Sequence, residues 1–140
     1  MRLLFLGDVM GRSGRTAISE RLAALKDELG VEFCVVNGEN ATNGAGLSPD
    51  HAKLLLAAGA DAITLGDHAF DQKDMLQFCE SEPRIVRPLN YSKAAPGRGA
   101  RVFEVTGGRR VLVAQVLGQV FMKRPFDDPF SAIEPVLKNA

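Results

Sequence analysis

The sequence predicts an α/β fold in which a mostly parallel sheet is built from β-α-β units. Three short apolar runs alternate with segments whose apolar residues recur at helical spacing. Each run is apolar throughout instead of alternating with polar residues, which is typical of strands buried on both faces. The three runs cover residues 2–6, 33–36 and 62–65. After Pro96 this rhythm stops, and two further strand-like runs flank a Gly-Gly pair.

Two helices are predicted between these strands. The first begins at Ser13 or Gly14, runs for about 15 residues and ends at Gly30, which suits the left-handed end of a helix. Its apolar positions are Ile18, Leu22, Leu25 and Leu29. The second helix begins at Pro49, with Ser48 as its N-cap, and continues through a cluster of leucines.

The second half of the chain is predicted to hold shorter elements. They are a helical segment at 72–80, a short strand at 85–86 and a β-hairpin with strands at 101–105 and 111–116. Gly107 and Gly108 supply the positive φ angles of the hairpin turn. Residues 117–129 look irregular. A final helix is expected at 131–138, where Pro135 weakens the pattern unless it lies in the first turn.

Composition is typical of one globular domain over residues 1–140 and limits the partners. The 17 basic residues balance the 17 acidic ones, so neither DNA nor an anionic membrane is expected to bind. Six arginines fall in one stretch, at 84, 87, 98, 101, 109 and 110. We favour the interpretation that these arginines lie in solvated loops and at strand edges. A local basic patch is the alternative. Cys34 and Cys79 suggest no disulfide scaffold, and no signal peptide or membrane span is seen, so we expect a cytoplasmic protein.

Polar side chains follow each of the three predicted strands, at the point where the strand ends. Asp8 follows the first strand, and Glu39 and Asn40 follow the second. Asp67 and His68 follow the third. Ligands of open parallel sheets bind beyond the carboxyl ends of the strands, which lie about 4.8 Å apart, so these side chains can converge in one site. Neighbouring glycines allow sharp backbone turns there.

Three carboxylates gathered at one edge repel one another, and a polyvalent cation relieves that repulsion. Carboxylate and amide oxygens suit Mg²⁺, Mn²⁺ or Fe²⁺, and a nearby imidazole broadens the choice. With metal bound, such a site can hold and polarise a phosphate and generate hydroxide from water. His68 is the only good proton donor in the set, so it is the candidate general acid.

Each candidate also has a purely structural interpretation. The aspartates could cap the segments that follow, N-G-E-N is prone to form turns, and a lone histidine usually sits satisfied at a strand end. We favour one joint site because the cluster recurs after three successive strands. His51 is interpreted as a surface residue. The G-D-V-M-G-R-S-G loop matches neither G-x-G-x-x-G nor the P-loop, which disfavours a phosphate cradle and a Rossmann-type nucleotide binder.

Several motifs occur in an order that matches a known family. They are G-D-V-M-G at 7–11, N-G-E-N at 37–40 followed by G-x-G-L-S, G-D-H-A-F-D at 66–71, R-P-L-N-Y at 87–91 and V-L-G-Q-V-F-M at 116–122. The chain resembles the YmdB-like branch of the calcineurin-like metallophosphoesterases, which is similar to 2′,3′-cyclic-nucleotide 2′-phosphodiesterases. The resemblance covers essentially the whole chain, but only about the first half of the family's length.

The resemblance implies the N-terminal part of an αββα sandwich, with the hairpin in the second sheet and two divalent metal ions, Fe or Mn before Mg, at the strand ends. It makes Asp8, Glu39 and Asn40 metal ligands, with Glu39 reaching both ions. It gives His68 to catalysis as the proton donor. Asp67 then occupies a ligand position where the family usually has Asn, and its extra charge is expected to tighten cation binding and to weaken the Lewis acidity felt by the phosphate.

The family also draws several histidine ligands from its second half, whereas His51 and His68 are the only histidines here. We therefore expect a truncated form of a longer protein, with weak metal binding, little activity and an exposed apolar surface that favours homo-oligomers. The resemblance implies a metal-dependent phosphodiesterase acting on 2′,3′-cyclic nucleotides or RNA-related substrates. The alternative is a non-catalytic metal- or nucleotide-binding domain of the same fold, which Asp67 and the missing histidines favour.

Overall fold

Four parallel strands form the central sheet of the computed structural model, which describes residues 1–140. Their order across the sheet is β1 (Leu3–Leu6), β2 (Phe33–Asn37), β3 (Ala62–Thr64) and β4 (Ile85–Val86). The strands pair in continuous register, with Leu6 opposite Val36 and Val36 opposite Ile63. The predicted parallel sheet of β-α-β units is confirmed.

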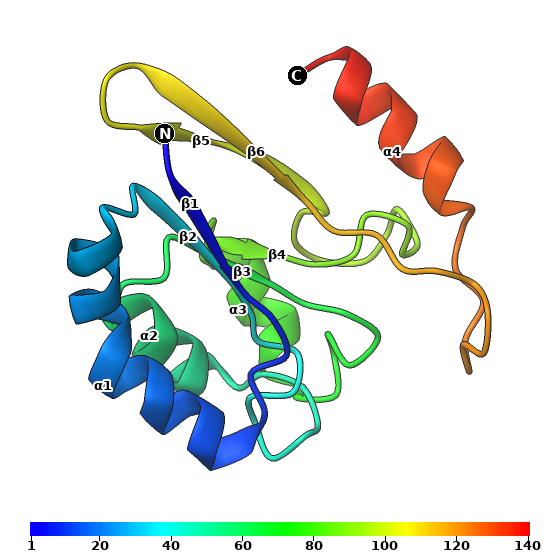
Figure 1. Cartoon of the computed structure of the whole chain (residues 1–140). Helices are drawn as coiled ribbons and strands as arrows, with labels where there is room; N and C mark the ends of the chain where they lie inside the picture. The colour runs from blue at the N-terminus through cyan, green and yellow to red at the C-terminus, as the bar shows by residue number, and fades with distance from the viewer.

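Helices α1 (Gly11–Leu29), α2 (Pro49–Ala57) and α3 (Met75–Ser81) cover one face of this sheet (Figure 1). Successive residues of a strand point to opposite faces, and in β2 the side chains of Cys34 and Val36 pack with the helices. The resulting cluster of 17 buried residues is the main hydrophobic core, and it contains both free cysteines.

Helix α1 begins earlier than predicted, at Gly11 instead of Ser13 or Gly14. No side chain caps it, and the backbone N–H of Gly11 donates to the carbonyl of Asn40 at 3.0 Å. That long-range hydrogen bond satisfies a donor at the helix N-terminus, which a local sequence pattern cannot reveal. Gly30, with a φ of 61°, ends the helix as predicted.

The starts of the next two helices show what local signals can and cannot specify. Helix α2 begins as predicted, because Ser48 Oγ accepts the backbone N–H of His51 at 3.3 Å and Pro49 occupies the first turn. Helix α3 begins at Met75, later than the predicted start at residue 72, because bends and turns occupy the preceding residues.

Strands β5 (Ala100–Val105) and β6 (Arg109–Ala114) form the predicted antiparallel hairpin, which packs on the other face of the sheet (Figure 1). Gly107 and Gly108 have φ angles of 82° and 71°, as the tight turn requires. The second core cluster consists of Phe33, Ala62, Val86, Val105, Val111 and Val113. Strands β2 to β4 are therefore buried on both faces, in agreement with their continuous apolar runs.

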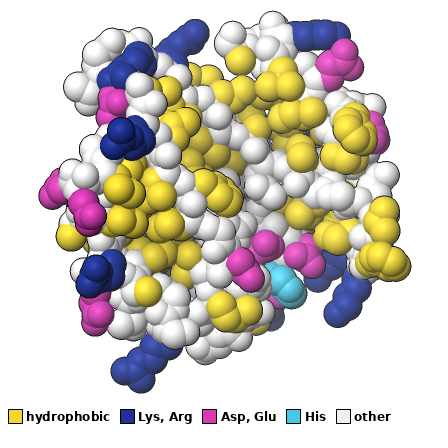
Figure 2. All heavy atoms as spheres, in the orientation of Figure 1, with side chains coloured by type: hydrophobic (Ala, Val, Ile, Leu, Met, Phe, Trp, Pro, Cys, Tyr) yellow, Lys and Arg dark blue, Asp and Glu magenta, His cyan; other side chains and the backbone are white.

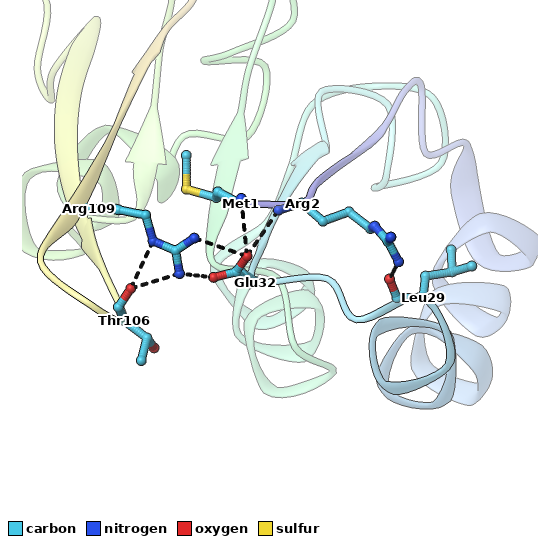
Figure 3. Close-up of polar contacts among 6 residues, drawn as sticks. All are labelled: Met1, Arg2, Leu29, Glu32, Thr106 and Arg109. Atoms are coloured by element: carbon cyan, nitrogen blue, oxygen red, sulfur yellow. Dashed lines mark hydrogen bonds and ion pairs between the residues drawn. The ribbon is translucent and has the colours of Figure 1, made fainter.

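A polar cluster at the amino ends of the strands joins the hairpin to the sheet (Figure 3). The guanidinium of Arg109 pairs with the carboxylate of Glu32, just before β2, and donates to the carbonyl of Thr106 at 3.0 Å. The backbone N–H of Arg2 donates to the same carboxylate at 3.1 Å. The pairing with Arg109 lowers the pKa of Glu32. Because these groups are partly exposed, the cluster orients the hairpin more than it stabilises the fold.

The six arginines of residues 84–110 do not share one environment. Arg87 is only 7% exposed, and its guanidinium donates to the carbonyls of residues 88, 95 and 96. Arg84 instead forms an ion pair with Glu82 at 2.7 Å. The interpretation of all six arginines as solvated is therefore wrong for Arg87. Its guanidinium can be buried because its N–H donors form hydrogen bonds with the carbonyls of one loop instead of with water.

Helix α4 (Pro129–Lys138) begins before its predicted start, because Asp128 accepts the backbone N–H of Ser131 at 2.7 Å and caps it. Pro135 lies inside the helix and beyond the first turn. The helix therefore tolerates a proline at a position where proline was expected to disfavour helix formation. None of its residues is buried. None of the helices in the structure combines the length and the apolar character that crossing a membrane requires.

The edge strand β1 keeps one face uncovered. Leu4 and Leu6 pack against the main core, whereas Leu3 and Phe5 point the other way and are 53% and 62% exposed. The hairpin covers the same face of β2 to β4 but leaves this part of β1 open. Figure 2 shows hydrophobic side chains gathered over this region beside the hairpin. An exposed apolar face of this kind favours self-association.

We predict that replacing both Leu3 and Phe5 by threonine lowers the self-association of the chain. Threonine keeps the strand propensity of β1 and removes most of its exposed apolar surface. Light scattering after size exclusion, over a concentration series, measures the change. Leu54→Gln, at another exposed leucine on α2, is the matched control. Equal association of the double variant and the wild type would show that this face is not the one that associates.

Candidate active site

The loops that carry the candidate residues meet at one edge of the sheet. Strands β1, β2 and β3 are adjacent and parallel, so their carboxyl ends lie side by side. The backbone N–H of Val9 donates to the carbonyl of Asn37 at 3.1 Å, and that of Gly38 donates to the carbonyl of Thr64 at 3.0 Å. These two hydrogen bonds connect the loop after each strand to the neighbouring strand.

Asp8 and Asn40 are in direct contact across the ends of β1 and β2. Asn40 Nδ2 donates to Asp8 Oδ1 at 2.7 Å. Asp8 has a φ of 46°, in the left-handed region that aspartate tolerates better than most residues. This backbone turn lets the exposed carboxylate of Asp8 reach the loop after β2.

Glu39 has a buried carboxylate oxygen that lacks a partner. Its Oε2 is shielded from solvent and accepts no hydrogen bond. Burial raises the pKa of this carboxyl, and the negative charge of Asp67 raises it further, while smaller contributions from the Asn37 side chain and from His68 act in the opposite direction. The carboxylate lies against Gly66 after β3, where any Cβ would overlap it. Gly66 therefore makes room for Glu39. The φ of Gly66 lies outside the left-handed region, so backbone conformation does not explain why a glycine stands here.

His68 is held by the two aspartates near it. Its Nδ1 donates to Asp71 Oδ2 at 2.6 Å, and its Nε2 lies 3.9 Å from Asp67 Oδ2. The hydrogen bond to Asp71 raises the pKa of His68, and the charge of Asp67 acts in the same direction. Asp71 closes the G-D-H-A-F-D motif, yet sequence reasoning assigned it no role. Its place three residues after His68 was the signal that could have found it.

Three further polar residues beside the candidates were also missed by sequence reasoning. The Tyr91 hydroxyl donates to the backbone carbonyl of Asp67 at 3.2 Å and so supports the loop that carries His68. Asn37 and Thr64 pair in register at the ends of β2 and β3, and each buries a side-chain oxygen without a hydrogen-bond partner. Asn37 opens the N-G-E-N motif, whereas no local pattern distinguishes Thr64 from any other strand residue.

The donors present fit a hard divalent cation. An ion next to Glu39 Oε2 would satisfy a buried anionic oxygen and relieve the repulsion between Glu39 and Asp67. No three His, Cys, Asp or Glu side chains lie close enough together to hold one ion. Such an ion would also need the amide oxygen of Asn40, water or donors from outside this chain. The metal-ligand roles of Asp8, Glu39, Asn40 and Asp67 stay predictions.

His51 lies apart from this edge and is not a free surface residue. It is half-buried, and its Nδ1 shares a hydrogen bond of 2.8 Å with Thr42 Oγ1. The same hydroxyl accepts the backbone N–H of Ser48 at 2.8 Å. His51 therefore helps to join the loop after β2 to the start of α2, and the surface interpretation is corrected accordingly. Burial lowers the pKa of His51, which favours the neutral imidazole.

We predict that Glu39→Gln stabilises the metal-free chain at pH 7. The folded state raises the pKa of Glu39, so it retains a proton that the unfolded chain loses above about pH 4.3. Wild-type stability should therefore fall as the pH rises through that range, and the amide should remove this loss. Urea unfolding of both proteins at pH 4, 5.5 and 7 measures the difference. A wild-type advantage that grows with pH in metal-free buffer would contradict the assignment.

We predict that Asp71→Asn lowers the pKa of His68. The carboxylate of Asp71 favours the imidazolium form of His68 and so raises the pKa of His68. The raised pKa stabilises the folded state at acid pH, and this stabilisation is lost as the pH rises through the pKa of the folded state. An NMR titration of the His68 ring protons measures the pKa directly. Asp74→Asn, at the start of α3, is the matched control because Asp74 makes no side-chain hydrogen bond. An unchanged pKa in Asp71→Asn would rule out the contact.

Comparison with known proteins places this chain in a family. A sequence model described as YmdB-like protein matches residues 4–140. A 2′,3′-cyclic-nucleotide 2′-phosphodiesterase of Bacillus subtilis is 37% identical over 140 residues, which make up 100% of this chain and 52% of that protein. The chain thus spans about half the length of the curated relatives it matches.

Two solved structures share the fold. One is a hypothetical protein from Thermus thermophilus, with a TM-score of 0.92 and 43% identity, which matches 100% of this chain and 54% of its own. The other, described as a novel phosphatase from Mycoplasma pneumoniae, has a TM-score of 0.88 and 34% identity over 98% of this chain and 50% of its own. The calcineurin-like α/β fold class expected from the sequence is confirmed. Because the family match extends over nearly every residue, the chain belongs to the YmdB-like proteins.

Proposed function

We propose that this chain supplies the metal-binding edge and the general acid of a metal-dependent phosphoesterase. The observation that carries the proposal is the unpartnered buried oxygen of Glu39, set near Asp67 and His68. The name of the Bacillus subtilis relative supports 2′,3′-cyclic nucleotides or similar phosphodiesters as substrates. The neighbouring acid, amide and imidazole groups are the types that phosphoester hydrolysis requires.

Four residues would hold the metal ions: Asp8, Glu39, Asn40 and Asp67. The oxygen ligands suit Fe²⁺ or Mn²⁺, with Mg²⁺ as a further option. When bound, such ions polarise a phosphoryl group and lower the pKa of a water molecule. Asn40 donates to Asp8 through its amide nitrogen, which leaves its amide oxygen available as a ligand. Asp67 adds a charge where the resemblance expects an amide, so it should strengthen cation binding.

His68 would donate a proton to the leaving oxygen. Because its Nδ1 donates to Asp71, the proton to be transferred is the one on Nε2. The raised pKa shifts the equilibrium of His68 toward the imidazolium, which is the form that a general acid needs. Asp71 would thus orient the ring and favour its protonated form.

The active form is proposed to include further metal donors from outside these 140 residues. The chain spans about half the length of its relatives, and it does not gather three His, Cys, Asp or Glu side chains around one point. By itself it would bind metal weakly and turn over little substrate. A cytoplasmic location belongs to the same proposal, and the two buried free cysteines suit a reducing compartment.

A non-catalytic metal- or nucleotide-binding domain is the second candidate. Asp67, at a position where the resemblance expects Asn, favours it. The two functions differ in their response to chelator. Nucleotide binding that persists in EDTA would favour the non-catalytic domain, whereas binding that requires Mn²⁺ would favour the phosphoesterase.

We predict that the longest protein encoded by this reading frame hydrolyses bis-p-nitrophenyl phosphate with Mn²⁺ or Fe²⁺. His68→Ala should lower kcat by about 10²–10⁴-fold, the usual range for a general acid. Asp8→Ala should lower the affinity for metal. A steady-state assay with a metal titration measures both effects.

The matched control for the histidine is His51→Gln, which lies outside the proposed site and should leave kcat unchanged. Circular dichroism of each variant confirms that it is folded. Wild-type rates in both His68→Ala and Asp8→Ala would refute the phosphoesterase proposal.

A further inference from the structure

A cleft of about 180 Å³ opens beside His68, and its two walls carry opposite charges. Asp67, His68 and Asp71 line one wall. Lys123 and Arg124, from the irregular segment before α4, line the other. Figure 2 shows basic side chains next to a group of acidic side chains and a histidine in the lower right part of this face. The irregular segment therefore forms part of the candidate site, although sequence analysis gave it no function.

The segment is an ordered loop because one buried side chain holds both of its ends. Asn90 is 1% exposed, and its Nδ2 donates to the carbonyls of Leu117 and Asp127 at 2.8 and 2.9 Å. Its Oδ1 accepts the backbone N–H of Leu117 at 2.8 Å. The backbone N–H of Asp127 donates to the carbonyl of Asn90 at 3.0 Å. These four hydrogen bonds define a closed loop over residues 117–127, which we call the clamped loop.

Aromatic packing sets the clamped loop against the site. The ring of Phe126 meets Tyr91 edge to face, with centroids 5.0 Å apart, and Tyr91 in turn donates to the carbonyl of Asp67. Across the loop, Gln119 Nε2 donates to the carbonyl of Phe126 at 3.0 Å. The loop is thus connected through Tyr91 to the backbone that carries His68.

The two cations of the clamped loop have no carboxylate partner within ion-pair distance, and both side chains are exposed. On the facing wall, Asp71 is already engaged by His68 at 2.6 Å. Burial raises the pKa of Tyr91 and the positive charge of Arg124 opposes this rise, which agrees with a guanidinium close to the cleft. Two unpaired cations held over a candidate phosphoester site are well placed to bind an anion.

We propose that the clamped loop is the substrate-binding wall of the site, and that Lys123 and Arg124 bind the phosphate oxygens of the substrate opposite His68. The proposal rests on the proposed function for the identity of the reaction, but the anion binding itself does not require catalysis. Arg124 offers a planar fork of donors that matches two phosphate oxygens, and Lys123 adds a point charge. Binding at this wall would orient the phosphate between the cations and the proton on His68.

The test measures the binding of inorganic phosphate to the ¹⁵N-labelled chain by NMR, at low ionic strength and without metal. Wild-type spectra should show phosphate-dependent shifts in residues 117–127. The double variant Lys123→Gln with Arg124→Gln should bind about tenfold more weakly or worse, since each lost charge-assisted hydrogen bond is worth roughly that factor. Both side chains are exposed, so the variant should fold. The matched control is Lys53→Gln with Arg110→Gln, which removes the same charge at exposed positions on α2 and β6.

Two results would overturn the proposal: no shift in the clamped loop of the wild type, or equal phosphate affinity in the wild type and the double variant. A parallel assay of bis-p-nitrophenyl phosphate hydrolysis separates it from the proposed function. If the double variant loses phosphate binding and no metal-loaded protein hydrolyses the ester, the role of the clamped loop is supported and the phosphoesterase proposal is refuted. If hydrolysis depends on His68 but the double variant keeps the KM and the phosphate affinity of the wild type, only the proposed role of the clamped loop is refuted.

Discussion

Parallel pairing of β1, β2 and β3 in continuous register is the constraint on which the rest of the structure depends. Because the strands run in one direction, the loops after Leu6, Asn37 and Thr64 leave the sheet at the same edge. The direct contact of Asp8 with Asn40 follows from this pairing, as does the closeness of Glu39 to Gly66. A slip of one residue would turn each side chain to the opposite face and separate both core clusters.

The chemistry of the edge conflicts with its stability. Glu39 places a carboxylate oxygen out of solvent without a hydrogen-bond partner, and the charge of Asp67 adds repulsion. Burying an unpaired carboxylate oxygen costs free energy, whereas burying an apolar side chain does not. Gly66 permits the close approach, and Asp8 adopts a left-handed backbone that few residues tolerate. Local destabilisation of this kind is typical of functional sites, and the cation that we propose for this site would offset it.

The R-P-L-N-Y motif organises structure around the site instead of acting in it. Arg87 satisfies three carbonyls of the loop after β4, and Asn90 closes the clamped loop with its side chain. Tyr91 connects that loop to the carbonyl of Asp67. Buried polar residues with every group satisfied specify one arrangement, and here they hold an irregular segment beside His68. The hairpin is oriented independently, at the opposite end of the strands, by Glu32 and Arg109.

The sequence by itself determined the α/β class, the alternation of strands and helices along the chain, the hairpin turn and the identity of the residues at the strand ends, because these depend on local apolar periodicity and on turn residues such as Ser48 and Gly107. Only the tertiary structure decided the early start of α1, the burial of Arg87 and the hydrogen bonds of His51. It also decided that Asp71 holds His68 and that Gly66 makes room for Glu39. Each of these depends on residues that are distant in sequence or on a side-chain direction, and hydrophobic periodicity carries no information about either.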